Sequence, residues 1–151
     1  MTKQARTQEE PFEHAGTMIR HLIHMNCAGF HGLILAGAGG VEKSRFVRGV
    51  LHDALGKDFN NVVSWQEHHK IKVAELISTL EDHAASEKLI VFDDMDRMFD
   101  DCEMVEILNA ALENERQRKI TVRPKKEHPY QSGFNAKIIV ITNDSLTSDD
   151  R

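Results

Sequence analysis

The residues with the clearest potential for chemistry lie in one glycine-rich segment, GAGGVEKSR, at residues 37–45. The segment follows a short apolar run and precedes a stretch of helical periodicity, so backbone N–H groups of a turn and a helix N-terminus can surround a phosphate chain. Lys43 would contact the β- and γ-phosphates of a nucleotide, and the Ser44 hydroxyl would bind Mg²⁺. The candidate nucleotide-contacting residues are Gly37, Ala38, Gly39, Gly40, Val41, Glu42, Lys43, Ser44 and Arg45.

One position departs from the pattern of a phosphate-binding loop, G-x-x-x-x-G-K-[ST], because Glu42 stands where the pattern has its second glycine. A carboxylate about 5 Å from a phosphate charge costs ~3 kcal/mol at an effective dielectric constant of about 20. A side chain there adds strain of ~1–3 kcal/mol if the backbone requires a positive φ. Two arrangements remain open, in which Glu42 turns outward or pairs with Lys43. We expect weakened nucleotide binding and very slow hydrolysis.

Two further segments end in polar residues that suit a magnesium–nucleotide site. The apolar run LIVF leads into Asp93 and Asp94, and KIIVIT leads into Asn143. Asp93 would hold the metal, mostly through water, Asp94 would polarise an attacking water, and Asn143 would position water or the γ-phosphate. Each signal has an ordinary structural alternative, since Asp also caps helices and Asn is common in turns.

The elements that would carry these residues alternate along the chain. Apolar periodicity predicts helices at 12–28, 43–55, 73–85 and 103–115, with Gly56 ending the second, and strands at 32–37, 61–65, 88–94, 119–122 and 136–143. This order predicts a three-layer α/β/α fold with a mainly parallel sheet, whose strands at 32–37, 88–94 and 136–143 end on a common rim. We expect a flexible tail at 1–11 and a single domain at 12–151.

The composition narrows the functional classes. The net charge of −5 argues against general binding of polyanions, and no apolar run approaches the ~20 residues of a membrane span. Cys27 and Cys102 match no redox or metal spacing, and the nine histidines have no partners at a convincing metal spacing. Two reduced thiols and no signal-peptide pattern favour a cytoplasmic protein.

The glycine loop, the Asp-Asp strand and the Asn-ending strand, in this order, resemble Walker A, Walker B and sensor 1 of P-loop ATPases of the AAA+ type. The resemblance covers about residues 12–143. Small phage-encoded ATPases and helicase-loader-like proteins are similar in the stretches GLILAGAGG, IVFDDMDRMF, EILNAALENERQRKITVRP and FNAKIIVITN. The resemblance implies a Mg-ATP site, in which Ser44 and Asp93 bind Mg²⁺ and Asp94 and Asn143 take part in catalysis. The resemblance also implies assembly into a ring or filament, and a role in phage or plasmid DNA replication, recombination or remodelling. If the protein is phage-encoded, the expected location is the host cytoplasm.

The sequence also departs from the family in two respects. Its acidic pair is Asp-Asp where AAA+ proteins more often have Asp-Glu, so Asp96 is a second candidate for the catalytic carboxylate. The family's last core strand, arginine-finger region and C-terminal helical lid have no counterpart in the 151 residues. We therefore expect binding to be better preserved than hydrolysis.

Basic residues gather between the fourth predicted helix and the last predicted strand, namely Arg116, Arg118, Lys119, Arg123, Lys125 and Lys126. Such a segment suits nucleic-acid phosphates, an arginine supplied to a neighbouring subunit's site, or simply a solvated loop. The leading hypothesis is therefore an impaired AAA+-like ATPase, with DNA or a replication protein as its candidate partner. The alternative is a non-catalytic interaction or nucleic-acid-binding module, and a small-molecule kinase is a weaker third option.

Overall fold

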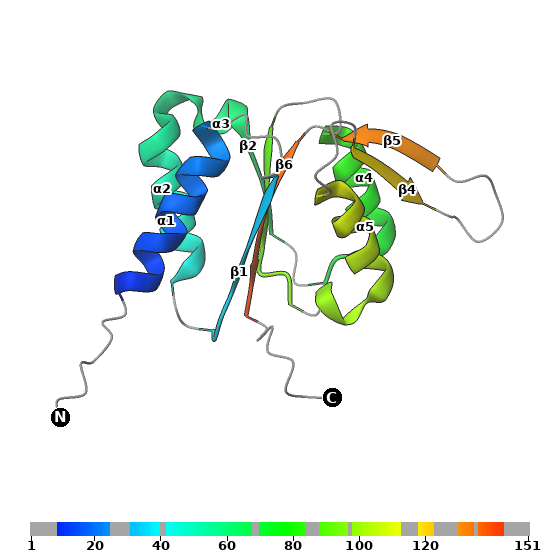
Figure 1. Cartoon of the computed structure of the whole chain (residues 1–151), viewed down its shortest axis with the longest axis horizontal. Helices are drawn as coiled ribbons and strands as arrows, with labels where there is room; N and C mark the ends of the chain where they lie inside the picture. Colours follow the sequence, from blue (N-terminus) through cyan, green and yellow to red (C-terminus); the bar gives the residue numbers. More distant parts are fainter. Residues whose placement is uncertain are drawn as a thin grey trace.

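The structure, a computed structural model, describes residues 9–24, 31–39, 42–67, 70–83, 88–96, 98–112, 118–122, 130–134 and 136–143. It contains a parallel sheet between two layers of helices, and a separate β-hairpin (Figure 1). The elements in chain order are α1 (Glu9–His24), β1 (Gly32–Ala36), α2 (Lys43–Leu55), η1 (Gly56–Asp58), α3 (Phe59–Val62), β2 (Val63–Glu67), α4 (Val73–His83), β3 (Leu89–Asp93), η2 (Met98–Asp100), α5 (Cys102–Leu112), β4 (Arg118–Val122), β5 (Tyr130–Phe134) and β6 (Lys137–Thr142).

Among the described residues, the main sheet has four strands in the order β1-β6-β3-β2, and every neighbouring pair is parallel. The last of the described strands along the chain, β6, therefore lies between β1 and β3. Ala36 is opposite Thr142, and Phe92 is opposite Val140, so β1, β3 and β6 end close together. We call this place, where the three strands end, the carboxyl rim of the sheet.

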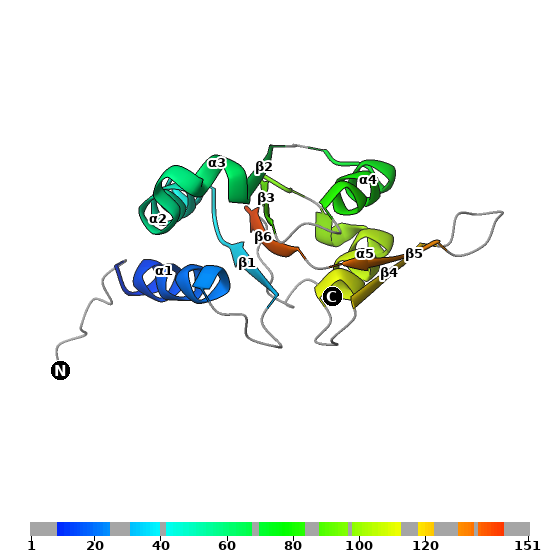
Figure 2. The same cartoon turned by 90° about the horizontal axis from the view of Figure 1, so that it is seen from above.

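Helices cover both faces of the sheet, as Figures 1 and 2 show: α1 and α2 lie on one side, and α4 and α5 on the other. Because side chains alternate along a strand, each central strand contributes side chains to two hydrophobic cores, one on each face of the sheet. In β3, Leu89 and Val91 pack with α1 and α2, whereas Ile90 and Phe92 pack with α4 and α5. This double burial explains why β3 and β6 are continuous apolar runs in the sequence.

The predicted α/β architecture is thus confirmed at the level of a parallel sheet with helices on both sides. The helix at 43–55 has the predicted bounds, and Gly56 ends it with a φ of +52°, a conformation that favours glycine. Other boundaries differ. The first helix begins at Glu9 rather than at 12, so residues 9–11 are helical rather than part of a tail, and β2 begins at Val63, after the helical turn α3.

The hairpin is the main feature that the sequence did not predict in full. The predicted strand at 119–122 corresponds to β4, which pairs antiparallel with β5 in a sheet of its own. No strand was expected at 130–134, because YQSGF has neither an apolar run nor an apolar alternation. The hairpin lies beside α4 and α5, on the side of the molecule away from α1 and α2 (Figure 1).

Candidate functional site

The carboxyl rim brings together side chains from three separate parts of the sequence. Lys43 and Ser44 begin α2, directly after the glycine loop, while Asp93 and Asp94 end β3 and Asn143 follows β6. We call these five residues the rim cluster. The predicted catalytic and metal-binding residues are therefore neighbours in the structure, joined by two groups of hydrogen bonds.

The first group is centred on the Lys43 ammonium. Its Nζ atom donates to the carbonyl oxygens of Gly37 and Ala38, both at 3.0 Å, and to Oδ1 of Asn143 at 3.1 Å. Lys43 is only 9% exposed. An ammonium has three protons to donate, so these three acceptors satisfy it and compensate its burial. Two carbonyl groups at the start of the loop thus face a positive charge at the N-terminus of α2.

Asn143 joins this cation to the second carboxylate of β3. Its Nδ2 atom donates to Oδ1 of Asp94 at 3.1 Å, while its own Oδ1 accepts from Lys43. The backbone N–H of Asn143 donates to Oδ1 of Asp96 at 3.3 Å. Asp94 has a φ of +58°, which Asp and Asn tolerate better than most residues with a side chain. The amide is therefore oriented by a donor on one side and an acceptor on the other.

The second group is centred on Asp93, which is 6% exposed. The Ser44 hydroxyl donates to Oδ1 of Asp93 at 2.5 Å, and the indole Nε1 of Trp65 donates to Oδ2 at 3.2 Å. Leu89, Val91 and Asp93 alternate onto the α2 face of the sheet, which brings the Asp93 carboxylate to Ser44. Asp94 is one residue further on, and its carboxylate contacts Asn143 instead.

Glu42 adopts one of the two expected arrangements: it turns outward and does not pair with Lys43. Its carboxylate pairs with Arg45, with Nη1 and Oε1 3.4 Å apart, and the two side chains are 73% and 82% exposed. It does not pair with Lys43, whose three protons are directed elsewhere. The expected strain is also absent, because Glu42 has a φ of −51° and its carbonyl accepts the first helical hydrogen bond from Phe46. Glu42 therefore turns outward, in a backbone whose φ is negative.

The glycines of the loop leave space around its backbone. A Cβ atom built on Gly37 would meet nothing within 4 Å, and one on Gly39 would only touch the Asn143 amide at 3.8 Å. The protein's own packing therefore does not require glycine at either place, whereas close approach of a phosphate to the backbone would. Gly40 and Val41 lie outside the described residues.

The oxygen atoms of Ser44 and Asp93 suit a cation that also has water or phosphate among its ligands. Within the described part of the chain, no three His, Cys, Asp or Glu side chains are grouped closely enough to hold a metal ion. Ser44 and Asp93 supply two hard oxygen donors in contact with one another. Mg²⁺ commonly binds through one or two protein oxygens and completes its shell with water and phosphate, so the pair fits Mg²⁺ bound with a nucleotide.

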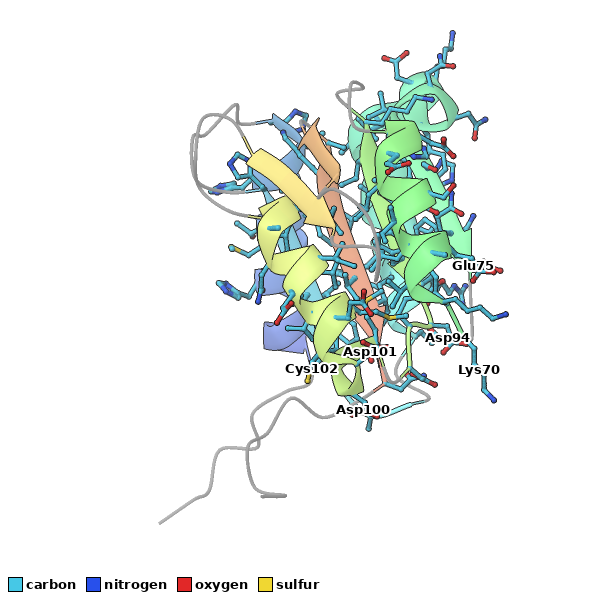
Figure 3. The ribbon with its side chains drawn as sticks, turned by 90° about the vertical axis from the view of Figure 1, so that its right-hand side faces the viewer. Lys70, Glu75, Asp94, Asp100, Asp101 and Cys102 are labelled. Atoms are coloured by element: carbon cyan, nitrogen blue, oxygen red, sulfur yellow. The ribbon has the colours of Figure 1, made fainter. Side chains whose placement is uncertain are left out.

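Further aspartates precede α5 in the chain. Figure 3 shows Asp94 at the same end of the molecule as Asp100 and Asp101. Asp101 caps α5, since its Oδ1 accepts from the backbone N–H groups of Glu103 and Met104 at 2.9 and 3.2 Å. Helix capping is therefore the role of Asp101, whereas Asp93 and Asp94 belong to the rim cluster.

The predicted basic segment lies in the chain between Asp94 and Asn143, and two of its members are described. Arg118 and Lys119 belong to β4, opposite Phe134 and Gly133 of β5. The other members, Arg116, Arg123, Lys125 and Lys126, lie outside the described residues.

Two residues of the site were missed by the sequence reasoning. Trp65 contacts Asp93 directly, and the Arg48 guanidinium lies 4.1 Å from the centre of the indole ring. No motif marks either residue. One signal was nevertheless available: Arg48 follows Ser44 by one helical turn, so both share a face of α2.

Residues 35–151 match a family of unknown function (DUF5906), and the chain belongs to this family. The matched region includes the glycine loop and the whole rim cluster. No curated protein matches the chain. None of the described helices has both the length and the apolar character needed to cross a membrane.

Proposed function

We propose that this chain is an AAA+-like, P-loop nucleotide-binding domain that takes ATP with Mg²⁺ at the carboxyl rim. The observation that carries the proposal is the rim cluster itself. A buried lysine at a helix N-terminus, a serine touching a strand-end aspartate, and an asparagine bridging the lysine to a second carboxylate form one continuous site. Such a combination of one cation, a helix N-terminus and two carboxylates suits a magnesium–polyphosphate ligand.

The strand order supports the same proposal. Because β6 lies between β1 and β3, the loop after β1, the carboxylates after β3 and the amide after β6 are brought to one place. Ligands of open parallel sheets bind outside the carboxyl ends of the strands. The resemblance to P-loop ATPases with an additional central strand agrees with β6 in that position.

Each residue of the rim cluster then has a role. Lys43 offsets phosphate charge, and Ser44 with Asp93 would hold Mg²⁺, which when bound neutralises further phosphate charge. Asp94 and Asn143 are linked to Lys43 by hydrogen bonds, and in these roles the Asp94 carboxylate would accept a proton from water and the Asn143 amide would orient that water. Lys43 and Asn143 already contact each other, so binding and hydrolysis residues are coupled through one hydrogen bond.

In this proposal, Glu42 lowers the affinity of the site for nucleotide, but by less than a buried carboxylate would. Its side chain is 73% exposed and faces Arg45, so solvent screens its repulsion of phosphate. The wider role that fits the resemblance is ATP-dependent work in phage or plasmid DNA replication, recombination or remodelling. Assembly into a ring or filament would let a neighbouring copy contribute an arginine to each site.

Titration of the full chain with a fluorescent ATP analogue tests the proposal. We expect saturable binding with Mg²⁺, weaker binding with EDTA, and a loss of about 100-fold or more in affinity for Lys43→Met, which removes the buried cation. Lys57→Met, which removes an exposed lysine from η1, is the matched control and should bind normally. Binding that is indifferent to both Mg²⁺ and Lys43 would refute the proposal.

A second candidate function is favoured by the hairpin. β4 and β5 form a two-stranded unit outside the parallel sheet, and β4 contains Arg118 and Lys119 within the basic stretch 116–126. A β-hairpin with clustered cations can contact the phosphates of single-stranded nucleic acid. The chain would then act as a nucleic-acid-binding module, whether or not it hydrolyses ATP.

Fluorescence anisotropy with labelled single-stranded DNA separates this second candidate from the first. We expect binding that weakens with rising salt, and a further loss in the double variant Arg118→Glu/Lys119→Glu. Lys57→Glu/Lys88→Glu changes the net charge equally, at described residues outside the hairpin, and serves as control. Equal losses in both double variants would refute hairpin-specific binding.

A further inference from the structure

The rim cluster has a neighbour that the proposed roles do not use, the side chain of Trp65. Its indole Nε1 donates to Oδ2 of Asp93 at 3.2 Å, while Oδ1 of the same carboxylate accepts from Ser44 at 2.5 Å. The two oxygens of Asp93 are thus held by two different donors. One donor lies on β2 and the other on α2, so the carboxylate is fixed from both sides.

The strand register explains how Trp65 reaches Asp93. β2 and β3 are parallel neighbours, with Trp65 opposite Val91 and Glu67 opposite Asp93. Trp65 packs against the core between the sheet and helices α1 and α2, the same side on which Val91 lies. The indole therefore extends along β3 from the level of Val91 to that of Asp93, the next residue on this face. There its N–H donates to the carboxylate at the end of the strand.

Arg48 holds the indole ring from the helix side. Its guanidinium carbon lies 4.1 Å from the ring centre, and its Nη2 atom is 3.5 Å from Oε1 of Glu67. A cation over an indole face is attracted by the ring's electrons. Ser44 and Arg48 are one turn apart and lie on the same face of α2. This face therefore contacts Asp93 directly through Ser44, and orients Trp65 through Arg48.

We infer that Trp65 is a positioning residue for a divalent cation held by Asp93 and Ser44. The indole N–H is a donor only, so it binds Oδ2 without competing for the cation, and it leaves Oδ1 directed toward Ser44. Carboxylates that bind metals are commonly oriented by such outer hydrogen bonds, and losing one costs about 10- to 100-fold in metal affinity. This inference rests on the proposed function.

The first test measures the Mg²⁺ requirement of nucleotide binding. Trp65→Phe keeps an aromatic ring and removes the N–H donor, and the full chain carrying Glu42→Gly provides a sensitive background. We expect the Mg²⁺ concentration for half-maximal binding of the ATP analogue to rise about tenfold. Affinity at saturating Mg²⁺ should change little. Gln66→Leu is the matched control, because its side chain contacts Ser64, on the opposite face of β2, and should leave the Mg²⁺ requirement unchanged.

The second test observes the hydrogen bond itself and needs no substitution at Trp65. The chain has one tryptophan, so its ¹⁵N-labelled form gives a single indole N–H resonance in a two-dimensional spectrum. We expect this resonance to shift when Mg²⁺ is added to the nucleotide-bound protein, and Arg48→Met to raise the Mg²⁺ requirement as Trp65→Phe does. A tryptophan that only fills the core would show neither effect.

The outcomes distinguish the inference from the proposed function. If the analogue binds with Mg²⁺ but the requirement is unchanged in Trp65→Phe and the indole resonance does not move, the positioning role is refuted and the nucleotide site stands. If the analogue does not bind at any Mg²⁺ concentration, both are refuted. Should Trp65→Phe fail to fold, as judged by circular dichroism, the indole resonance and Arg48→Met decide the question.

Discussion

The Nζ atom of Lys43 lies 3.1 Å from Oδ1 of Asn143, a hundred positions away in the chain. One residue begins the helix after the glycine loop, and the other follows the strand inserted between β1 and β3. Because the same amide also donates to Asp94, the cation and the second carboxylate are linked through a single side chain. A change at any of the three is therefore expected to affect the other two.

Removing the side chain of Glu42 should strengthen nucleotide binding. The exposed carboxylate repels phosphate through solvent, so Glu42→Gly should raise ATP affinity by about two- to fivefold, and Glu42→Gln should give most of that gain. The backbone tolerates either change, since φ is negative and glycine is acceptable at a helix N-cap. Titration with the fluorescent ATP analogue in Mg²⁺ measures the gain.

The control for this prediction is Glu81→Gln, which removes an exposed carboxylate from α4, on the other face of the sheet. The control should leave affinity unchanged. An equal gain in Glu81→Gln would show that net charge, rather than the loop, limits binding, and no gain in either Glu42 variant would contradict the account of Glu42.

Replacing Asp94 by Asn should separate hydrolysis from binding. Asn tolerates the positive φ of 58° at this position, so the backbone is preserved while the proton-accepting carboxylate is lost. In the Glu42→Gly background, we expect turnover to fall by about 100-fold or more with nucleotide affinity within about twofold. A phosphate-release assay beside the binding titration provides both values.

Asp100→Asn is the matched control for Asp94→Asn, because Asp100 is an exposed aspartate at the same end of the molecule (Figure 3). Its turnover should be normal. If Asp94→Asn retains full turnover and Asp96→Asn loses it, the catalytic carboxylate is Asp96, and the assignment of Asp94 is wrong.

Packing of β1 against α5 can be tested at Gly32. A Cβ atom there would lie 2.4 Å from Cδ2 of Leu112 and 3.1 Å from the Ile138 carbonyl oxygen, so Gly32→Ala should lower the free energy of unfolding by about 1–3 kcal/mol. Gly49→Ala is the contrast. Its Cβ meets nothing within 4 Å in the interior of α2, so it should raise stability by about 0.5–1 kcal/mol. Urea unfolding followed by circular dichroism measures both changes, and an unaltered Gly32→Ala would contradict the described packing.

The sequence was sufficient to predict the parallel sheet and the rim cluster because both depend on local signals. β3 and β6 are apolar runs that end in polar residues, and in a parallel sheet such ends meet at one side. The helix at 43–55 was predicted with its observed bounds because its apolar stripe is regular and Gly56 ends it. The strand order itself is a tertiary property, which local pattern does not determine.

The parts that were missed depend on contacts between distant residues. Trp65 contacts Asp93 only because β2 and β3 are neighbours in a particular register. For Glu42, the sequence left two arrangements open, and the choice between them depends on where Arg45 lies in the first turn of α2 and on Lys43 already being satisfied by three acceptors. The strand β5 has only Tyr130 and Phe134 as typical strand formers, and it is a strand through its pairing with β4.

The most direct test of the central claim is amide hydrogen exchange of the full chain with ADP and Mg²⁺, compared with ADP and EDTA. The account predicts Mg²⁺-dependent protection confined to the glycine loop and first turn of α2 (37–46), the end of β3 and the residues after β6. Exchange in α4 and in the hairpin should be unchanged. Absence of protection at the loop, or protection located elsewhere in the chain, would contradict a magnesium–nucleotide site at the carboxyl rim.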